Sequence, residues 1–288
     1  MAGSNPVLPP ARAFVHGLRD LGWEEGRNVI IERRSPEGHP ERAPAIFAEL
    51  RSRDVDVVAI GASPWLVEAG RQAMPTTPIV AVFAEDPVET GLVESLARPG
   101  GNITGVTGST APEITGKRLQ LLKELAPAVS RVAVLGTTKA WTLHRDRADG
   151  AQADGMLFIP LERPEQLEGA LASVPREGAD GLIVQAGPTA YVHAKRIVDF
   201  AAVNRLPAIY TFREPVEAGG LISYGINVES LFAQLAGFAD RILKGSRPAE
   251  IPVEQPTRFE TVVNVTTARA LGLRVPESIL LLADEVIE

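Results

Sequence analysis

Short apolar runs alternate with amphipathic stretches along most of the chain. The run Ile79–Phe83 is too short for a helix and rich in β-branched residues, so we predict a strand buried on both faces. After it we predict a helix over residues 87–96, a Pro-Gly-Gly-Asn turn at residues 99–102, and a second strand at Ile103–Thr107. These elements form one βαβ unit. Its right-handed crossover makes the strands parallel and gathers ligand-binding loops at their carboxyl ends.

The same alternation continues on both sides of this unit. Further strands are predicted over residues 29–33, 55–60, 131–135, 156–161, 181–185, 207–210, 219–224 and 259–264. Further helices are predicted over residues 10–21, 42–53, 64–73, 113–125, 165–173, 191–204, 228–243 and 266–271. Alternating apolar and polar residues place the strand at 29–33 near a sheet edge, and residues 136–155 predict only a weak helix. Two strand–helix series, over residues 1–108 and 131–215, therefore predict two α/β lobes.

Composition narrows the class of protein. The 288 residues are 45% apolar and 23% charged, which is typical of a globular protein of about two domains. A net charge of −7 without any Lys/Arg cluster argues against a nucleic-acid partner. No apolar run approaches the roughly 20 residues that span a bilayer. The absence of cysteine excludes disulfides, thiolate nucleophiles and cysteine-ligated zinc.

Motifs for catalysis, metals or cofactors are not apparent. Glu85 and Asp86 follow a strand, where they could act on a ligand or equally cap the next segment of chain. We expect surface positions without metal-binding spacing for all four histidines, His16, His39, His144 and His193. There is no phosphate-binding glycine loop and no GxSxG nucleophile elbow. Trp65 and Tyr224 stand near strand ends, where their rings could line a small-molecule site or simply pack.

Several blocks of sequence resemble one family. These are "DVDVVAIGASP", "EDPVETGLVESLARPGGNITGVTG", "GKRLQLLKELAPAVSRVAVL", "GGLISYG" and "DRILKGSRPAEIPVEQPTRFETVVNVTTARALGL". They are similar to the ABC transporter substrate-binding proteins, the type I periplasmic binding proteins that include tryptophan- and phenylalanine-binding members. The resemblance covers nearly the whole chain in order.

This resemblance implies an α/β fold of two Rossmann-like lobes, each with a parallel central sheet. Residues 1–110 and 226–254 would form the N-terminal lobe, and residues 111–225 and 255–288 the C-terminal lobe. Three crossovers, near residues 107–116, 223–227 and 252–257, would join the lobes. The protein would be a monomeric, extracytoplasmic binding protein without enzymatic activity, cofactor or metal. Its partners would be a small-molecule ligand and the permease and ATPase subunits of the transporter.

The resemblance also implies that ligand contacts come from loops at strand ends. Together with the aromatic Trp65, the expected ligand-binding residues are Ser4, Ala62, Ser63, Trp65, Glu85, Asp86, Thr107, Gln185, Pro188, Tyr210 and Tyr224. Hydroxyl and N–H groups would hold a carboxylate, an acid such as Asp86 an amine, and the rings an apolar group. Because no arginine stands in these loops, we expect an amino acid or aromatic acid rather than a multiply charged anion.

Two departures and two alternatives accompany this interpretation. Family members carry a signal sequence and a first strand before the Gly3-Ser4 loop, so we expect the natural chain to begin upstream of Met1. The loop at residues 136–139 also differs from the family pattern. A ligand-sensing protein of the same fold is one alternative. A two-lobed racemase or isomerase is the other, although cofactor-independent racemases of that shape use a cysteine pair, which this chain lacks.

Overall fold

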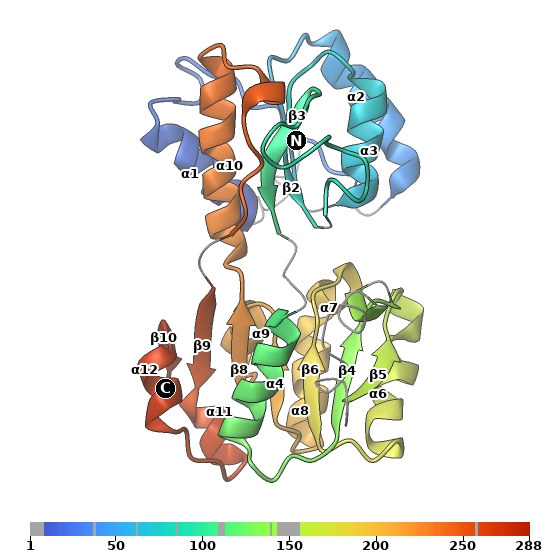
Figure 1. The fold of residues 1–288 in the computed structure, drawn as a ribbon, viewed down its shortest axis with the longest axis vertical. Helices are drawn as coiled ribbons and strands as arrows, with labels where there is room; N and C mark the ends of the chain where they lie inside the picture. Colours follow the sequence, from blue (N-terminus) through green and yellow to red (C-terminus); the bar gives the residue numbers. More distant parts are fainter. Residues whose placement is uncertain are drawn as a thin grey trace, which may run out of the picture. The chain divides into compact units, whose positions relative to one another are not determined.

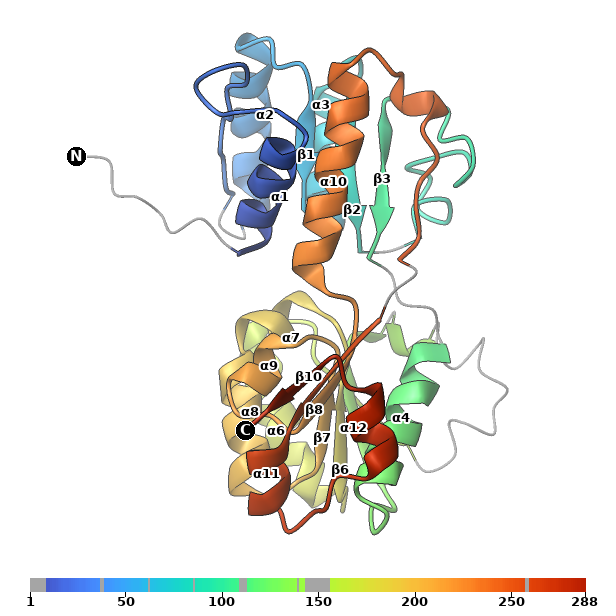
Figure 2. The same cartoon turned by 90° about the vertical axis from the view of Figure 1, so that its left-hand side faces the viewer.

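The chain folds into two compact units in the computed structural model, which describes residues 9–36, 39–61, 63–84, 86–108, 113–138, 140–142, 156–256 and 259–288 (Figures 1 and 2). Unit 1 comprises Met1–Ser109 and Val228–Thr257, and unit 2 comprises Thr110–Asn227 and Arg258–Glu288. The chain thus passes between the units at residues 109–110, 227–228 and 257–258. The predicted α/β fold with three crossovers is confirmed.

Unit 1 is built on a small parallel sheet. Its strands lie in the order β1 (Val58–Ile60), β2 (Ile79–Phe83), β3 (Ile103–Thr107). Every residue of β2 and β3 is buried, as the unbroken apolar character of the "IVAVF" run predicts. The three carboxyl ends therefore lie at one edge of the sheet.

Helices cover this sheet. Phe47 of α2 (Ala43–Ser52) and Val67 of α3 (Pro64–Ala73) pack into the same apolar core as Phe83 of β2. The long α10 (Val228–Leu243) contacts β2 and β3, and α1 (Pro9–Asp20) packs along α10 (Figure 2). Two short 3-10 helices, η1 (Pro40–Arg42) and η4 (Pro248–Glu250), complete the unit.

Two predictions for unit 1 are wrong. Residues 29–33 form no strand, because Val29 makes only an isolated bridge with Glu25 and no described segment pairs with the residues that follow. Residues 87–96 form successive turns instead of a helix. Gly91 takes a φ of 68°, a left-handed conformation that interrupts a right-handed helix in the middle of this segment.

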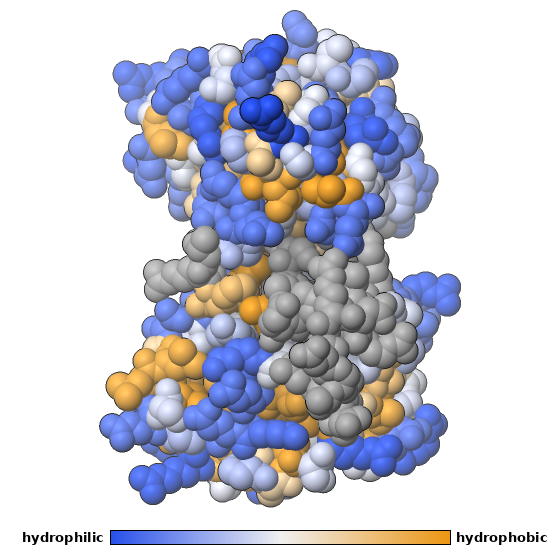
Figure 3. Space-filling view, viewed as in Figure 1, coloured by the Kyte–Doolittle hydropathy of each residue, from blue (hydrophilic) through white to orange (hydrophobic). Residues whose placement is uncertain are grey.

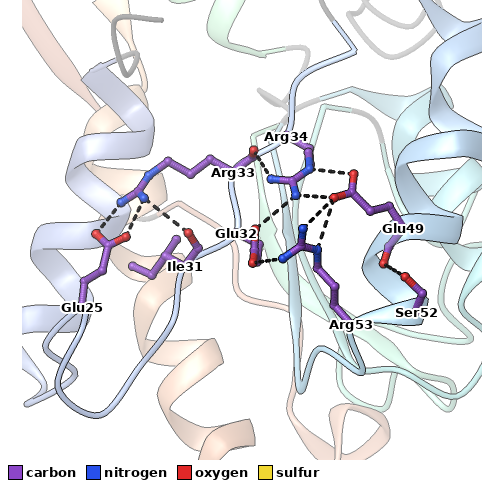
Figure 4. A network of polar contacts seen from close by, with 8 residues as sticks. All are labelled: Glu25, Ile31, Glu32, Arg33, Arg34, Glu49, Ser52 and Arg53. Carbon is purple, nitrogen blue, oxygen red and sulfur yellow. Dashed lines mark hydrogen bonds and ion pairs between the residues drawn. The ribbon is translucent and has the colours of Figure 1, made fainter. Parts of the chain in front are cut away.

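Ion pairs fasten the irregular segment after Val29 to α2 (Figure 4). Arg34 binds both carboxylate oxygens of Glu49, at 2.9 and 2.5 Å, and also pairs with Glu32 at 3.2 Å. Arg53 in turn contacts Glu32 at 2.7 Å and Glu49 at 3.2 Å. Two arginines and two glutamates thus alternate in one network, which replaces the strand pairing that this segment lacks.

Unit 2 is built on a larger sheet of seven strands in the order β10-β9-β8-β7-β6-β4-β5. All neighbours are parallel except β8 and β9. The strands are β4 (Val132–Gly136), β5 (Met156–Pro160), β6 (Gly181–Val184), β7 (Ala208–Tyr210), β8 (Ile222–Gly225), β9 (Glu260–Asn264) and β10 (Glu285–Ile287). The final strand, β10, was not predicted from the sequence.

Two helical layers enclose this sheet (Figure 2). Leu182 and its neighbour Ile183 point into separate apolar clusters on opposite faces. The cluster of Leu182 includes residues of α6 (Leu167–Arg176), α7 (Pro188–Val192), α8 (Ala194–Val203) and α9 (Glu214–Glu217). The cluster of Ile183 includes residues of α4 (Glu113–Leu125), α11 (Val265–Ala270) and α12 (Glu277–Leu282). A 3-10 helix, η3 (Pro164–Gln166), precedes α6. Most of the weak helix predicted within residues 136–155 lies outside the described residues.

Hydrophilic residues predominate on the face drawn in Figure 3, where the hydrophobic residues lie in separate patches. The described helices include none with the length and apolar character needed to cross a membrane. The described acids and histidines likewise form no group of three or more that could hold a metal ion.

Candidate ligand-binding site

The predicted site residues of unit 1 gather at the carboxyl edge of its sheet. Ser63 follows β1, Asp86 follows β2, and Thr107 is the last residue of β3. These strands are parallel, so the three residues stand along the same edge. Ser4, Ala62 and Glu85 lie outside the described residues.

Local hydrogen bonds already occupy part of this edge. The Asp86 Oδ1 atom accepts from the backbone N–H groups of Val88 at 2.8 Å and Glu89 at 3.2 Å, which is the capping role considered from the sequence. The Thr107 N–H donates to the carbonyl of Glu254 at 2.8 Å, while Trp65 is 37% exposed in the first turn of α3. Asp86 therefore has only its second carboxylate oxygen without one of these bonds.

The predicted residues of unit 2 also follow strand ends. Strands β5 and β6 flank β4 on opposite sides, so the strand order reverses at β4. In open α/β sheets, ligands bind outside the carboxyl ends of strands at such a point. Gln185 follows β6 there, and its N–H donates to the Leu135 carbonyl at 2.9 Å. A Cβ on Gly136 would collide with the Gln185 Oε1 atom, so glycine leaves room for this amide.

A cavity of about 200 Å³ lies beside the carboxyl ends of β6 and β7. We name it the strand-end cavity; it is lined by Val184, Gln185, Ala190, Tyr191, Ala194, Tyr210, Thr211, Phe212, Glu214 and Pro215. These residues come from the two strand ends and from α7, α8 and α9, which follow them in sequence (Figure 1). Every lining residue belongs to unit 2.

Two of the predicted ligand-binding residues line the strand-end cavity, whereas Tyr224 does not. Gln185 and Tyr210 both line it, and Pro188 begins α7 between them in sequence. Tyr210 belongs to the apolar cluster on the α8 face, whereas Tyr224 packs against the cluster on the α4 face and stacks on Phe259 at 5.7 Å. The two tyrosines thus do not form one aromatic wall.

Three oxygen atoms on the strand-end cavity are buried without a hydrogen-bond partner among the described residues. They are Gln185 Oε1, the Tyr210 hydroxyl and Glu214 Oε2. Tyr210 is only 1% exposed, and its burial raises the pKa of the phenol. Nearly all buried polar atoms in folded proteins are paired, so these three oxygens make the cavity a candidate site for a polar group.

Glu214 is the acid of this cavity. Burial raises the pKa of its carboxyl group, because desolvation disfavours the charged form. Its Oε1 atom lies 3.4 Å from the Tyr191 hydroxyl. The guanidinium of the neighbouring Arg213 forms ion pairs with Glu217, Glu260 and Glu285 instead.

A buried arginine lies in α4, on the other face of the sheet. Arg118 is 1% exposed; its Nε donates to the Tyr224 carbonyl at 2.8 Å, and its Nη2 has no partner among the described residues. Burial lowers the pKa of Arg118 to about 10. In the next turn towards the helix start, Thr115 Oγ1 accepts from Gln185 Nε2 at 3.3 Å.

Sequence reasoning missed Glu214, Tyr191 and Phe212 in the strand-end cavity. Glu214 stands four residues after the end of β7, so a search extended beyond the first loop residues would have included it. For Arg118 a signal was present, because it shares helical spacing with Leu121, Leu122 and Leu125, which are all buried.

The two units on parallel-dominated sheets have the α/β fold of the type I periplasmic binding proteins. The chain matches the family described as "ABC transporter substrate binding protein" over residues 9–287. The chain therefore belongs to this family of substrate-binding proteins, which are not enzymes.

Individual relatives agree with this assignment. The "Tyrosine-binding protein" of Clostridioides difficile is 26% identical over 94% of this chain and 79% of its own length. The solved ABC domain in complex with L-Trp from Streptococcus pneumonia has a TM-score of 0.85 at 24% identity, covering 99% of this chain and 96% of that one. A Vibrio cholerae structure described as a conserved domain protein has a TM-score of 0.84 at 23% identity, covering 96% and 94%. These two solved structures are similar in fold.

Proposed function

We propose that the protein captures an amino acid with an aromatic or large aliphatic side chain, or a related aromatic acid, for an ABC-type import system. In this role it works outside the cytoplasm as a monomer and delivers its ligand to a membrane permease that an ATPase drives. Family membership over residues 9–287 supports the transport role. The relatives whose names mention tyrosine and L-Trp support the ligand class.

The residues that line the strand-end cavity are the observation that supports the proposed ligand class. Its lining contains no lysine, arginine or histidine, so it offers no cation to a phosphate or dicarboxylate. The rings of Tyr191 and Phe212 meet edge to face, with centroids 5.6 Å apart, and both line the cavity. Such a combination of rings and few polar groups suits a small organic ligand.

The division of the chain into two units supports a binding site to which both units contribute residues. We propose that unit 1 contributes Ser63, Asp86 and Thr107, and unit 2 contributes Gln185, Tyr210 and the start of α7. A ligand that contacts both units favours the closed state by the difference between its affinities for the closed and open states. The three connecting segments would then act as the hinge.

A titration panel tests this function. Isothermal titration of the purified protein with the standard amino acids, sugars, phosphate and dicarboxylates should give binding to an amino acid. Small-angle scattering should then show a smaller radius of gyration at saturating ligand. Binding of a sugar or dicarboxylate without any amino acid would exclude the proposed ligand class, and an unchanged scattering profile would exclude closure.

A further inference from the structure

The three unpaired oxygens of the strand-end cavity share one chemical character. Gln185 Oε1 and the ionised Glu214 carboxylate can only accept hydrogen bonds, and the Tyr210 hydroxyl can accept as well as donate. Of the four buried side-chain atoms without a partner among the described residues, these three line the cavity, and the fourth belongs to Arg118. A group that fills the cavity must therefore supply hydrogen-bond donors.

The charge of the cavity also favours a ligand group that donates hydrogen bonds and, in addition, one that is positively charged. Glu214 takes part in no ion pair among the described residues, and the guanidinium beside it is bound to three other carboxylates. The charge of Arg213 acts on Glu214, but its ion pairs are made with the other carboxylates. A half-buried carboxylate without an ion-pair partner is costly, and a bound cation would offset that cost. Neighbouring aromatic rings, here Tyr191 and Phe212, also attract cations.

The size of the cavity limits what can enter. At about 200 Å³ it lies below the roughly 300–1,000 Å³ of pockets that enclose whole drug-sized ligands. It therefore suits one end of a ligand, such as an ammonium group and the carbon that bears it, rather than the entire molecule.

We infer that the strand-end cavity is the subsite for a cationic amine, whose N–H groups bind Glu214 Oε2, Gln185 Oε1 and the Tyr210 hydroxyl. This inference rests on the proposed function and deepens it, because it selects amine-bearing ligands over amine-free acids. It also assigns the amine to Glu214 in place of Asp86, whose Oδ1 already accepts two backbone N–H groups.

Three ligand series test the subsite. Each series contains an amino acid, its decarboxylated amine and its deaminated acid, for tyrosine, tryptophan and leucine. Isothermal titration compares the wild-type protein with Glu214→Gln and Asp86→Asn. Glu214→Gln should weaken binding of amine-bearing probes by about 10- to 100-fold, as expected for loss of a charge-assisted hydrogen bond. The affinity for the matching deaminated acid should change by less than about threefold.

Controls separate a local effect from a general one. Glu165, an exposed acid before α6, provides the matched variant Glu165→Gln, which should leave all affinities unchanged. Tyr210→Phe removes only the hydroxyl and should weaken the amine-bearing probes by about 5-fold or more. Circular dichroism confirms that each variant is folded.

The outcomes distinguish this inference from the proposed function. Selective loss of amine-bearing probes in Glu214→Gln supports the subsite, whatever Asp86→Asn does. Equal weakening of amines and acids, no weakening at all, or wild-type binding restricted to the deaminated acids overturns the subsite and leaves the transport function standing. If none of the nine probes binds, the amino-acid function and the subsite fail together.

Discussion

Arg118 and Tyr224 are joined by a 2.8 Å hydrogen bond from the guanidinium Nε to the backbone carbonyl. This bond ties the first half of α4 to the end of β8, just before residues 226–227 lead the chain out of unit 2 into α10. An ideal Cβ on Gly225 would lie 3.4 Å from Arg118 Nη2, so the guanidinium packs directly against this connection. Arg118 thus supports the backbone from which one of the three connecting segments departs.

Removing Arg118 should destabilise unit 2. Arg118→Ala leaves a cavity and an unpaired carbonyl, and we expect it to lower the free energy of unfolding by about 2–4 kcal/mol. Arg118→Met retains most of the side-chain volume, so it should cost less than Arg118→Ala. Urea denaturation measures both variants against Lys123→Ala, an exposed substitution on the same helix. An Arg118→Ala protein as stable as the Lys123→Ala control would contradict the supporting role.

The packing of α1 against α10 should depend on Gly17. A Cβ at this position would lie 2.9 Å from the Cβ of Ala236 and 3.0 Å from the carbonyl oxygen of Ala233. We expect Gly17→Ala to separate the helices and to cost about 1–3 kcal/mol in the free energy of unfolding.

Gly237, on α10, provides the matched control, because a Cβ there would meet no atom within 4 Å. Gly237→Ala should stabilise the protein by about 0.5–1 kcal/mol through the higher helix propensity of alanine. Denaturant titration of the two variants should therefore give shifts of opposite sign. Shifts of the same sign would show that helix propensity, not the close approach of the helices, decides the outcome at Gly17.

The sequence predicted the α/β architecture because buried parallel strands have a strong local signal. Runs such as Ile79–Phe83 and Val132–Gly136 consist almost entirely of apolar residues, and both are fully buried strands. The prediction of a helix at residues 87–96 was wrong because Gly91, in the middle of this segment, takes a positive φ that a right-handed helix does not allow. The prediction of a strand at residues 29–33 was wrong because a strand also needs a partner strand. Local alternation of apolar and polar residues does not supply that partner.

The candidate site was predicted less completely than the fold. Strand ends could be located, so Gln185 and Tyr210 were found at the edge where the cavity lies. The register of a strand decides to which face of the sheet its last residues point, because a shift of one residue reverses the face. Tyr224 lies on the face opposite to that of Tyr210, and the sequence did not show this difference. Glu214 came from a four-residue helix after β7, and only tertiary packing brings its carboxylate to the cavity.

The ion-pair network in Figure 4 should show measurable coupling between Arg34 and Glu49. A double-mutant cycle with Arg34→Met and Glu49→Gln isolates their interaction, which should favour folding and shrink as salt is raised from about 0.05 M to about 1 M. The Arg27–Glu24 pair is more exposed, at 74% and 50% of side-chain area, and has only one contact, so its cycle should give a smaller coupling. Equal coupling in both cycles would show that the network adds nothing beyond a surface ion pair.

Because of Glu214, the stability of the folded protein should fall as the pH rises above the ordinary pKa of a glutamate carboxyl group. Burial raises the pKa of its carboxyl group in the folded state, so the folded protein binds this proton more tightly than the unfolded chain does. The resulting stabilisation is fully present below the ordinary pKa and is lost as the pH rises through the raised one. Glu214→Gln lacks this titration, so the wild-type protein should lose stability relative to the variant as the pH rises above about 4.3, the ordinary pKa of a glutamate.

Thermal unfolding of both proteins across this range measures the effect. The titratable and charged groups around Glu214 are Tyr191, Tyr210, Arg213 and Glu217. Because these groups are the same in both proteins, their contributions largely cancel in the difference between the two stabilities. The control Glu165→Gln, an exposed carboxylate, should follow the wild-type profile. A difference between wild type and Glu214→Gln that stays constant with pH would show that the buried carboxylate does not carry this penalty.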